Sequence, residues 1–417
     1  MSDFYPIISK KLVRSNKLLR KIQKENIKQH KHIKGKYPKV KIGKIAALVA
    51  DNTYYDFTQA IQPIVLTDIK DIHELLLKLD QYNITGMSGN GFPSSNKIKT
   101  FMASACQEKY IVINAVECDP GLVHDSWLLT NRYEYISTAA NFLNKELGAK
   151  RTILASKSAP PSNFQGNATI KSTTNLTTKS APNSTTQPTT TSTTQPISTS
   201  TTQSASISHT KLFMPEIYHL PNRYPMGEEH ILIKEVLGID LPAKDIPAEH
   251  GVLVINLQTI ETIGEILLGQ YKPNTRYITV ADYTHGQATV AKVVNGMPVM
   301  DILQRVFGLP EGEKAYAGFG AMGAIAASAE TMISSITNML CYSQDFQYSD
   351  PIKCKKCGAC SRKCPMSVSA KDIIQAFIKK QSDDLSKYNI DSCIGCATCN
   401  YHCRAGINVA DVVLKVR

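Results

Sequence analysis

The sequence predicts a multidomain α/β protein that ends in a separate cysteine-rich region. The chain has 417 residues, enough for about two to four domains. Predicted strands and helices alternate along most of it, which is typical of a mostly parallel α/β sheet. The C-terminal region differs, because most of the 11 cysteines are concentrated there. These observations separate an α/β body from a cysteine-rich tail.

The predicted elements follow from hydrophobic patterns. Residues 69–82 and 228–238 have the apolar spacing of helices, and Gly238 is placed to stop the second one. Short apolar runs predict buried strands. Residues 271–310 change to a β-rich pattern with one helix. The predicted strands of the α/β body are 109–116, 151–156 and 250–259.

The cysteines form two runs with the same spacing, C-x₂-C-x₂-C-x₃-C, which wraps a loop around a cubic iron–sulfur cluster. Three thiolates of a run bind one cluster, and the fourth reaches the other cluster. We therefore predict two [4Fe–4S] centres. One has the ligands Cys354, Cys357, Cys360 and Cys403, and the other has Cys393, Cys396, Cys399 and Cys364, which precedes Pro365.

Zinc sites and disulfide bonds are the alternatives for these cysteines. Zinc sites usually pair two C-x₂-C units, and disulfides are typical of secreted chains. We expect the unpatterned Cys106, Cys118 and Cys341 to be buried reduced thiols. A reducing, cytoplasmic location follows, because thiolates awaiting iron would otherwise oxidise.

Between the two runs, residues 370–381 predict an amphipathic helix. Its apolar side chains recur on one face, and we assign them to the core of the tail rather than to a site. These side chains are Ile373, Ile374, Phe377 and Ile378.

The net charge of +12 is concentrated at the N-terminus. Residues 10–44 hold 14 Lys or Arg and the single acid Glu25, with leucines at near-helical spacing. A basic amphipathic helix could lie on an anionic membrane surface or dock on an acidic partner, and a solvated arm is the alternative. No nucleic-acid motif accompanies the charge. No apolar stretch approaches the roughly 20 residues that span a bilayer, so any association would be peripheral, on the cytoplasmic face of the inner membrane.

Residues 156–210 are rich in Ser, Thr, Gln, Asn and Pro, with near-repeats of STTQP. Such a segment cannot bury enough apolar surface to offset the entropy of ordering, so we predict a disordered insert. It interrupts one α/β domain at a surface loop, where added length costs little.

Four loops of the α/β body have the composition of a ligand site. A glycine-rich loop lets backbone N–H groups approach a phosphate, and loops after parallel strands meet at the edge where such sheets bind ligands. A helix N-terminus favours anions. The loops are Gly86–Pro93, Asn114–Gly121, Tyr224–Glu229 and Asn256–Thr259.

The order GFP, NAVECDPG, YPMGEE and NLQT, followed by two cysteine runs, resembles the RnfC family. It is more distantly similar to the flavin- and NADH-binding subunit of respiratory complex I. The resemblance covers residues 80–155 and 211–417. It implies an FMN that accepts hydride from NADH and passes single electrons to two [4Fe–4S] clusters.

The resemblance also implies roles for individual residues. Gly86, Gly89, Gly91 and Phe92 would form the flavin loop, with Lys97 near the phosphate. The flavin ring and ribityl chain would contact Asn114, Glu117 and Asp119, and Glu117 is the implied catalytic residue. The flavin or nicotinamide side would contact Gly227, Glu228 and Glu229, and the FMN phosphate would contact Asn256 and Thr259.

Together these patterns predict a complex I flavin-subunit-like FMN domain, a β-grasp module and an α-helical ferredoxin-like domain with two [4Fe–4S] clusters. The predicted boundaries are 1–44 for the basic arm, 45–79 for a reduced barrel-sandwich remnant and linker, 80–270 for the FMN and NADH domain, 271–330 for the soluble-ligand-binding β-grasp module and 341–417 for the cluster domain.

Three functions are compatible with this organisation. The first is a peripheral NADH-oxidising subunit of an Rnf-type ion-translocating complex, partnered by other electron-transport subunits. The second is a soluble NADH-dependent carrier that feeds a dedicated reductase. The third is a relay that has lost flavin and uses only its clusters.

Overall fold

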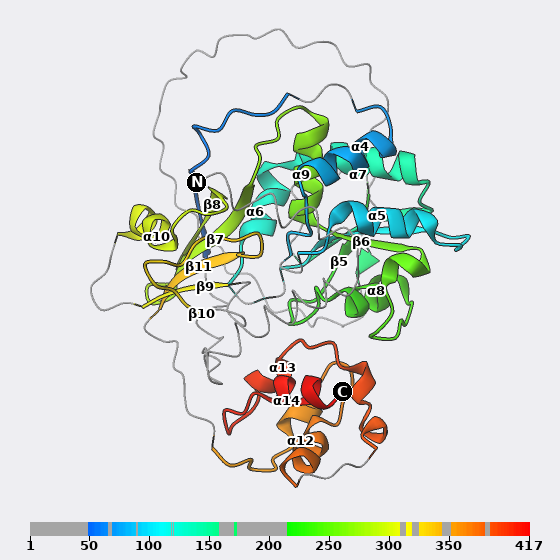
Figure 1. The fold of residues 1–417 in the computed structure, drawn as a ribbon, viewed down its shortest axis with the longest axis vertical. Coiled ribbons are helices and arrows are strands. Elements are labelled where there is room, and N and C mark those ends of the chain that lie inside the picture. The colour runs from blue at the N-terminus through cyan, green and yellow to red at the C-terminus, as the bar shows by residue number, and fades with distance from the viewer. Residues whose placement is uncertain are drawn as a thin grey trace, which may run out of the picture.

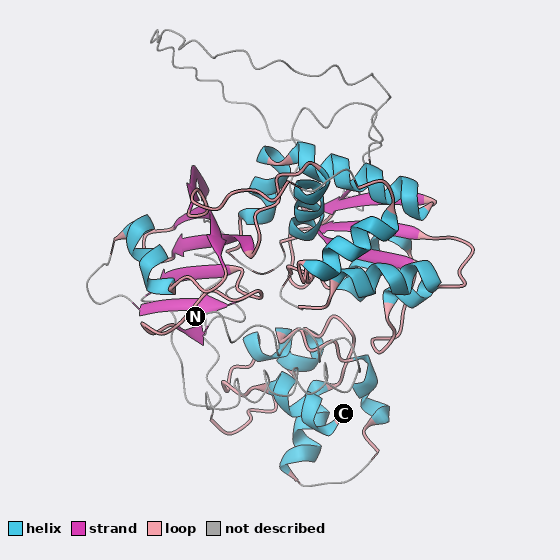
Figure 2. Cartoon of the chain, turned by 45° about the horizontal axis from the view of Figure 1, so that its top comes forward, coloured by secondary structure: helices cyan, strands magenta, loops and turns pink. Residues whose placement is uncertain are grey.

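The computed structural model describes residues 49–65, 69–88, 91–117, 119, 121–157, 171–172, 215–308, 314–318, 325–343, 352–379 and 384–417. These residues form an α/β domain, a β-rich module beside it and a helical C-terminal domain next to both (Figures 1 and 2). The predicted basic arm at 1–44 and nearly all of the predicted insert at 156–210 lie outside them.

The α/β domain is built on a five-stranded sheet in the order β4-β5-β3-β2-β6, with every neighbouring pair parallel. The predicted parallel sheet is therefore confirmed. Buried strands with apolar residues on both faces are expected when helices cover both sides of such a sheet. The strands are β2 (Tyr110–Ala115), β3 (Arg151–Ser156), β4 (Lys171–Ser172), β5 (Glu216–His219) and β6 (Val252–Asn256).

Successive side chains of β2 point to opposite faces of this sheet, as the strand period requires. Ile111 and Ile113 pack into a large core beneath five helices, whereas Val112 packs with Ile233 beneath α8 (Glu229–Leu237). Helix α8 ends at Gly238 in the left-handed region, as predicted. The five helices are α4 (Ile72–Gln81), α5 (Ser94–Ala103), α6 (His124–Asn131), α7 (Tyr133–Leu147) and α9 (Leu257–Leu267).

One predicted strand is shorter in the structure. We expected a strand over 250–259, but η2 (Pro247–His250) precedes β6 and helix α9 begins at Leu257. The Asn256 side chain accepts a hydrogen bond from the Gln258 backbone N–H at 3.0 Å, which caps the helix. Because Asn is a preferred N-cap residue, it ends the strand, and Thr259 lies in the first helical turn.

The β-rich module is a six-stranded mixed sheet in the order β1-β8-β7-β11-β9-β10. Helix α10 (Val299–Phe307) covers it, with Ile302 and Leu303 in the shared core. Strand β1 pairs in parallel with β8, so it joins this sheet instead of forming a separate remnant within 45–79. The strands are β1 (Val49–Asp56), β7 (Thr275–Asp282), β8 (Gln287–Val294), β9 (Lys314–Gly318), β10 (Ile325–Ala326) and β11 (Met339–Ser343).

The C-terminal domain is small and helical. Ile373 and Ile374 on α12 pack against Val409 and Val413 on α14 and against the cysteine loops. Phe377 and Ile378 are 47% and 55% exposed, so their assignment to the core was wrong: the described residues leave the C-terminal end of α12 uncovered. Its elements are α11 (Ala359–Arg362), α12 (Ala370–Ile378), η4 (Ser386–Tyr388), η5 (Ile390–Ser392), α13 (Thr398–Tyr401) and α14 (Val409–Val416).

Within the described ranges, no helix combines the length and the apolar composition needed to cross a bilayer.

Candidate functional site

Two asparagines mark the carboxyl edge of the parallel sheet. Asn114 on β2 and Asn256 on β6 are partners in the strand register. The Asn114 amide donates to the carbonyl of Gly227 at 2.9 Å, and its oxygen accepts from the Val116 backbone N–H at 3.1 Å. Three of the four loops predicted from sequence therefore meet at this edge.

The glycine-rich loop is attached to the same edge. Its ends are joined by a hydrogen bond from the Gly86 N–H to the Phe92 carbonyl, at 2.7 Å. The Met87 N–H donates to Thr259 Oγ1 at 3.1 Å, which fastens the loop to the first turn of α9. Gly91 has φ +61°, a conformation that favours glycine. Gly89 lies outside the described residues.

Helices α5 and α8 are joined beside this loop. Lys97 of α5 and Glu229 of α8 form an ion pair at 2.5 Å, and both side chains are largely buried. Glu228 caps α8 by accepting from the backbone N–H groups of His230 and Ile231. The structure thus brings the predicted phosphate lysine next to the predicted nicotinamide-side acids.

Glu117, the predicted catalytic residue, follows β2 and is only 3% exposed. Its carboxylate accepts from Ser126 Oγ at 2.8 Å and from the Asp125 backbone N–H. Burial raises the pKa of Glu117, and burial together with the Glu117 charge raises the pKa of Asp125. Two neighbouring carboxyls that resist ionisation are typical of functional sites. Asp119, also predicted, is half-buried.

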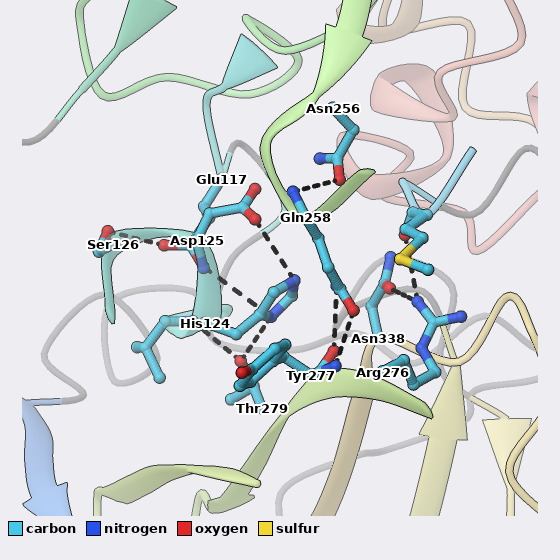
Figure 3. A network of polar contacts seen from close by, with 12 residues as sticks. Glu117, His124, Asp125, Ser126, Asn256, Gln258, Arg276, Tyr277, Thr279 and Asn338 are labelled. Carbon is cyan, nitrogen blue, oxygen red and sulfur yellow. Dashed lines mark hydrogen bonds and ion pairs between the residues drawn. The ribbon is translucent and has the colours of Figure 1, made fainter. Parts of the chain in front are cut away.

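His124 connects this acidic pair to the β-rich module (Figure 3). Its Nδ1 lies 3.0 Å from Thr279 Oγ1 on β7 and 3.9 Å from the Glu117 carboxylate. Burial, and secondarily the Arg276 charge, lowers the pKa of His124 to about 3. The ring is therefore neutral at physiological pH.

Arg276 on β7 connects the β-rich module to the glycine-rich loop. Its guanidinium is fully buried and donates to the Met87 carbonyl at 3.1 Å and to the Asn338 side chain. Burial lowers its pKa to about 9, and no ion pair to a carboxylate is found within the described part of the chain. Sequence analysis missed Arg276, although a single cation in a buried strand was an available signal.

Several buried polar atoms around the loop have no hydrogen-bond partner among the described residues. They include Ser94 Oγ at the start of α5, Asp125 Oδ1 and Arg276 Nε. Such atoms are costly unless a ligand or water satisfies them. The glycine loop, two nearby cations and the N-terminus of α9 fit a phosphate, while Asn114 and the carboxyls fit a polar ring system. The residues present therefore fit FMN.

The eight patterned cysteines gather in the two crossed sets. Cys354, Cys357 and Cys360 of the first run line one cavity together with Cys403 of the second run. Cys364 lies with the other set, because its charge, after burial, contributes to raising the pKa of both Cys393 and Cys396. The fold thus places the fourth cysteine of each run with the other run.

No disulfide joins the described cysteines of the two runs, and no three of their sulfurs lie within 4.8 Å of one another. All eight cysteines are free. The only described group of three or more His, Cys, Asp or Glu ligand atoms within 4.8 Å of one another is Glu117, His124 and Asp125. Four sulfurs around a tetrahedral zinc ion would lie ~3.8 Å from one another, for Zn–S bonds of about 2.3 Å. The described cysteine sulfurs form no group that close. Backbone N–H groups of Lys356 and Ile407 point at the sulfurs of Cys354 and Cys403, each at 3.4 Å, as in cluster loops.

The cysteine domain touches the α/β domain at the second run. The Tyr224 hydroxyl donates to the carbonyl of Cys396 at 2.5 Å, and Lys244 forms an ion pair with Asp391 at 2.6 Å. Tyr224 belongs to the same loop as Gly227, so this contact lies close to the candidate flavin edge.

The unpatterned cysteines differ from one another. Cys341 is fully buried, as predicted. Cys106 is only partly buried, so the prediction that it is buried was wrong. It lies near Gly251, which follows the η2 turn. Cys118 lies outside the described residues.

The parallel sheet and the glycine loop define the class of a flavin-domain protein, to which a cysteine-rich helical domain is attached. Residues 79–265 match the family described as the Nuo51 FMN-binding domain. The chain is similar to the C subunit of the ion-translocating oxidoreductase complex of Rhodobacter capsulatus, with 23% identity over 305 residues, which cover 71% of this chain and 50% of the relative. The predicted RnfC resemblance is confirmed.

Two further proteins are similar to this chain, the first in sequence and the second in fold. The C subunit of the Na(+)-translocating ferredoxin:NAD(+) oxidoreductase complex of Acetobacterium woodii is 21% identical over 73% of this chain and 61% of its own length. A chain of the "NAD+-reducing [NiFe]-hydrogenase in the H2-reduced state" has a similar fold, with a TM-score of 0.53 and 13% identity over 87% of this chain and 66% of that chain. The chain spans about half the length of the curated relatives it matches.

Proposed function

We propose that this chain is an RnfC-like electron-transfer flavoprotein. It binds FMN and two [4Fe–4S] clusters, and it passes electrons from NADH to a partner subunit of an Rnf-type ion-translocating complex. The contact between Tyr224 and Cys396 carries this proposal, because it joins the loop at the candidate flavin edge to a cysteine run.

Bound FMN would supply the exchange between a two-electron hydride and single electrons, which neither NADH nor an iron–sulfur cluster can perform alone. The loop of Gly86, Gly91 and Phe92 would enclose it. Thr259 and Asn256 at the start of α9 would meet its phosphate, because a helix N-terminus favours anions. Lys97 would add positive charge on the same side.

The acidic residues would serve the ring and the nicotinamide. Asn114, Glu117 and Asp119 follow β2 and would face the ring, and the loop of Gly227, Glu228 and Glu229 would border the nicotinamide side. Glu117 is held in place by Ser126 and the Asp125 N–H. Burial raises its pKa, which favours the protonated carboxyl that a general acid needs.

The cysteines would hold the clusters in the two crossed sets. The set of Cys393, Cys396, Cys399 and Cys364 includes the residue that contacts the α/β domain. The set of Cys354, Cys357, Cys360 and Cys403 lines a cavity and does not include the residue that makes that contact. Electrons would therefore pass through the second run before the first.

The direction of flow and the partner distinguish this proposal from others. The name of the Acetobacterium woodii relative pairs ferredoxin with NAD(+), and the same residues would serve electrons travelling toward NAD⁺. A soluble NADH-dependent carrier that feeds a dedicated reductase is a second candidate. A cluster-only relay is a third.

The test is cofactor content and an NADH-reduction spectrum. Anaerobically reconstituted protein should contain about eight irons, from two four-iron clusters, and one FMN that NADH bleaches. The Cys106→Ala variant is the control, because that cysteine belongs to neither run. Zinc in place of iron would reject the clusters, and iron without flavin would leave only the relay.

A further inference from the structure

Three buried side chains with metal-binding chemistry gather beyond the carboxyl end of β2 (Figure 3). Glu117 comes from the loop after this strand, and His124 and Asp125 begin α6. Each of the three is at most 5% exposed. One ligand atom of each lies within 4.8 Å of the other two, and no other described group of three or more His, Cys, Asp or Glu residues is as compact.

The spaces between these groups are too wide for hydrogen bonds. His124 Nδ1 lies 3.9 Å from Glu117 Oε1, and His124 Nε2 lies 3.9 Å from Asp125 Oδ1, whereas hydrogen bonds from nitrogen to oxygen are about 2.7–3.2 Å long. Asp125 Oδ1 is buried and has no hydrogen-bond partner among the described residues. A buried carboxyl oxygen in that position is costly unless a ligand satisfies it.

A metal ion would fit between these three side chains after a small contraction. Nitrogen and oxygen atoms about 2.1 Å from an ion lie roughly 3.0–3.4 Å from one another in octahedral or tetrahedral geometry. Ligand atoms within 4.8 Å of one another reach that range through shifts of roughly 1 Å in each side chain.

The ligands are already oriented by outer partners. Thr279 Oγ1 on β7 lies 3.0 Å from His124 Nδ1, and Ser126 Oγ donates to the Glu117 carboxylate at 2.8 Å. The Asp125 backbone N–H also donates to Glu117. Metal-binding histidines and carboxylates are usually held by such hydrogen bonds, which fix the ring and the carboxylate in the binding orientation.

The balance of charge favours a divalent cation. The ion pairs of the described ranges join neither Glu117 nor Asp125 to a lysine or an arginine. Lys157, whose charge acts on both carboxyls, donates to the Glu117 backbone carbonyl. Burial, and secondarily the Arg276 charge, lowers the pKa of His124 to about 3, so the imidazole is in the neutral form that binds metals. One divalent ion would balance the two carboxylates.

We propose that Glu117, His124 and Asp125 bind one divalent transition-metal ion of the Mn²⁺, Fe²⁺ or Zn²⁺ class. Imidazole suits Fe²⁺ and Zn²⁺ and carboxylates suit Mn²⁺, whereas Ca²⁺ and Mg²⁺ take oxygen ligands and soft ions take thiolates. On binding, each ligand atom donates an electron pair to the ion, the protons held by the carboxyls pass to solvent, and no group is oxidised or reduced.

This metal site goes beyond the proposed function, with which it shares Glu117. A proton and a metal ion compete for the same carboxylate, so an occupied site would withhold the proton of a general acid and inhibit NADH oxidation. Binding of the ion itself requires neither FMN nor NADH, and it is therefore tested without them.

The experiment titrates the full chain, with its iron reconstituted anaerobically, with Mn²⁺. This ion is paramagnetic and prefers carboxylates to thiolates, which keeps it away from the cysteine runs. Free Mn²⁺ is measured by electron paramagnetic resonance, and proton release by calorimetry in two buffers that differ in ionisation enthalpy. We expect about one bound Mn²⁺ per chain and a release of protons on binding.

Two variants and a control locate the ion. Asp125→Asn keeps the size of the side chain and should weaken Mn²⁺ binding by about tenfold or more, and Thr279→Val, which removes the hydroxyl beside His124, by about tenfold. Thr279→Val is the second test if Asp125→Asn does not fold, as judged by circular dichroism. Asp245→Asn removes the carboxylate that pairs with the exposed His250 at 2.9 Å and should match the wild type.

A wild type that binds no Mn²⁺ at millimolar concentration would overturn the proposal. Wild-type affinity in folded Asp125→Asn, or in Thr279→Val, would overturn it as well. An equal loss of affinity in Asp245→Asn would also overturn it, because the ion would then not be specific to the buried group.

Discussion

The Tyr224 hydroxyl donates a hydrogen bond to the backbone carbonyl of Cys396, with 2.5 Å between the two oxygens. Three residues further along the same loop, the Gly227 carbonyl accepts from Asn114 at the end of β2. One short loop therefore connects the edge of the parallel sheet with the second cysteine run. In the proposed function, electrons would cross from the α/β domain to the cysteine domain at this contact.

Replacing Tyr224 by Phe should weaken that path. Loss of the hydrogen bond should cost about 0.5–1.5 kcal/mol and loosen the domain contact, so cluster reduction should slow several-fold. Flavin reduction by NADH and iron content should stay at wild-type values in stopped-flow and iron assays. Tyr218→Phe is the matched control, because its hydroxyl donates to the Glu235 carbonyl away from the cysteines. Equal slowing in both variants would contradict the path.

Crossed ligation predicts which cysteines act together. Cys403→Ala and Cys354→Ala should each remove the same paramagnetic centre and lower the iron content from about eight to about four. Cys364→Ala should remove the other centre. If Cys403→Ala and Cys393→Ala abolish the same signal instead, each run holds its own cluster.

Glu117→Gln should slow NADH oxidation by about 10²-fold, the usual contribution of a general acid or base. The amide keeps the size of the side chain, and the clusters should remain intact by electron paramagnetic resonance. Glu108→Gln is the control, since this carboxylate pairs with Lys150 at the surface. A wild-type rate in Glu117→Gln would remove Glu117 from the chemistry.

Arg276→Met should weaken FMN binding, because Arg276 holds the glycine loop through the Met87 carbonyl. The expected loss is about tenfold in affinity, or about 1.4 kcal/mol, measured by quenching of flavin fluorescence. Arg305→Met changes a cation on α10 that lies over Phe57 and should bind FMN normally. If Arg276→Met binds FMN with wild-type affinity, Arg276 contributes to the packing of the β-rich module and not to FMN binding.

Asp125→Asn should become relatively more stable as pH rises. Burial and the Glu117 charge raise the folded-state pKa of Asp125, so the folded protein retains a proton that the unfolded chain releases. Between the pKa of Asp125 in the unfolded chain and its higher pKa in the folded protein, the free energy of unfolding of the wild type therefore falls by about 1.4 kcal/mol per pH unit. The amide that replaces this carboxyl in the variant cannot ionise. Neighbouring His124, Lys157 and Asn256 are the same in both proteins.

Urea unfolding at pH 5 and pH 8 measures this difference. The free energy of unfolding of Asp125→Asn minus that of the wild type should be more positive at pH 8 than at pH 5. A constant gap would mean that Asp125 ionises normally in the folded protein.

Local patterns predicted the parts of this protein that depend on short spacings. The cysteine runs, the strand before Asn114 and the helix that ends at Gly238 are of this kind. The strand expected over 250–259 failed because Asn256 serves as a helix cap, which outweighs the apolar pattern. The burial expected of Phe377 failed because periodicity identifies an apolar face but not what covers it.

The site depends on longer relationships. Arg276 and Thr279 lie more than 150 residues from Met87 and His124, the groups they contact, and no short motif records such a pairing. The Tyr224 contact also joins residues 172 positions apart. Residue type and spacing thus determined the kinds of cofactor this chain suits, because ligand chemistry is local. Only the tertiary structure decided which cysteine run lies near the candidate flavin edge and which buried charges surround that edge, because burial and electrostatics depend on elements distant in the chain.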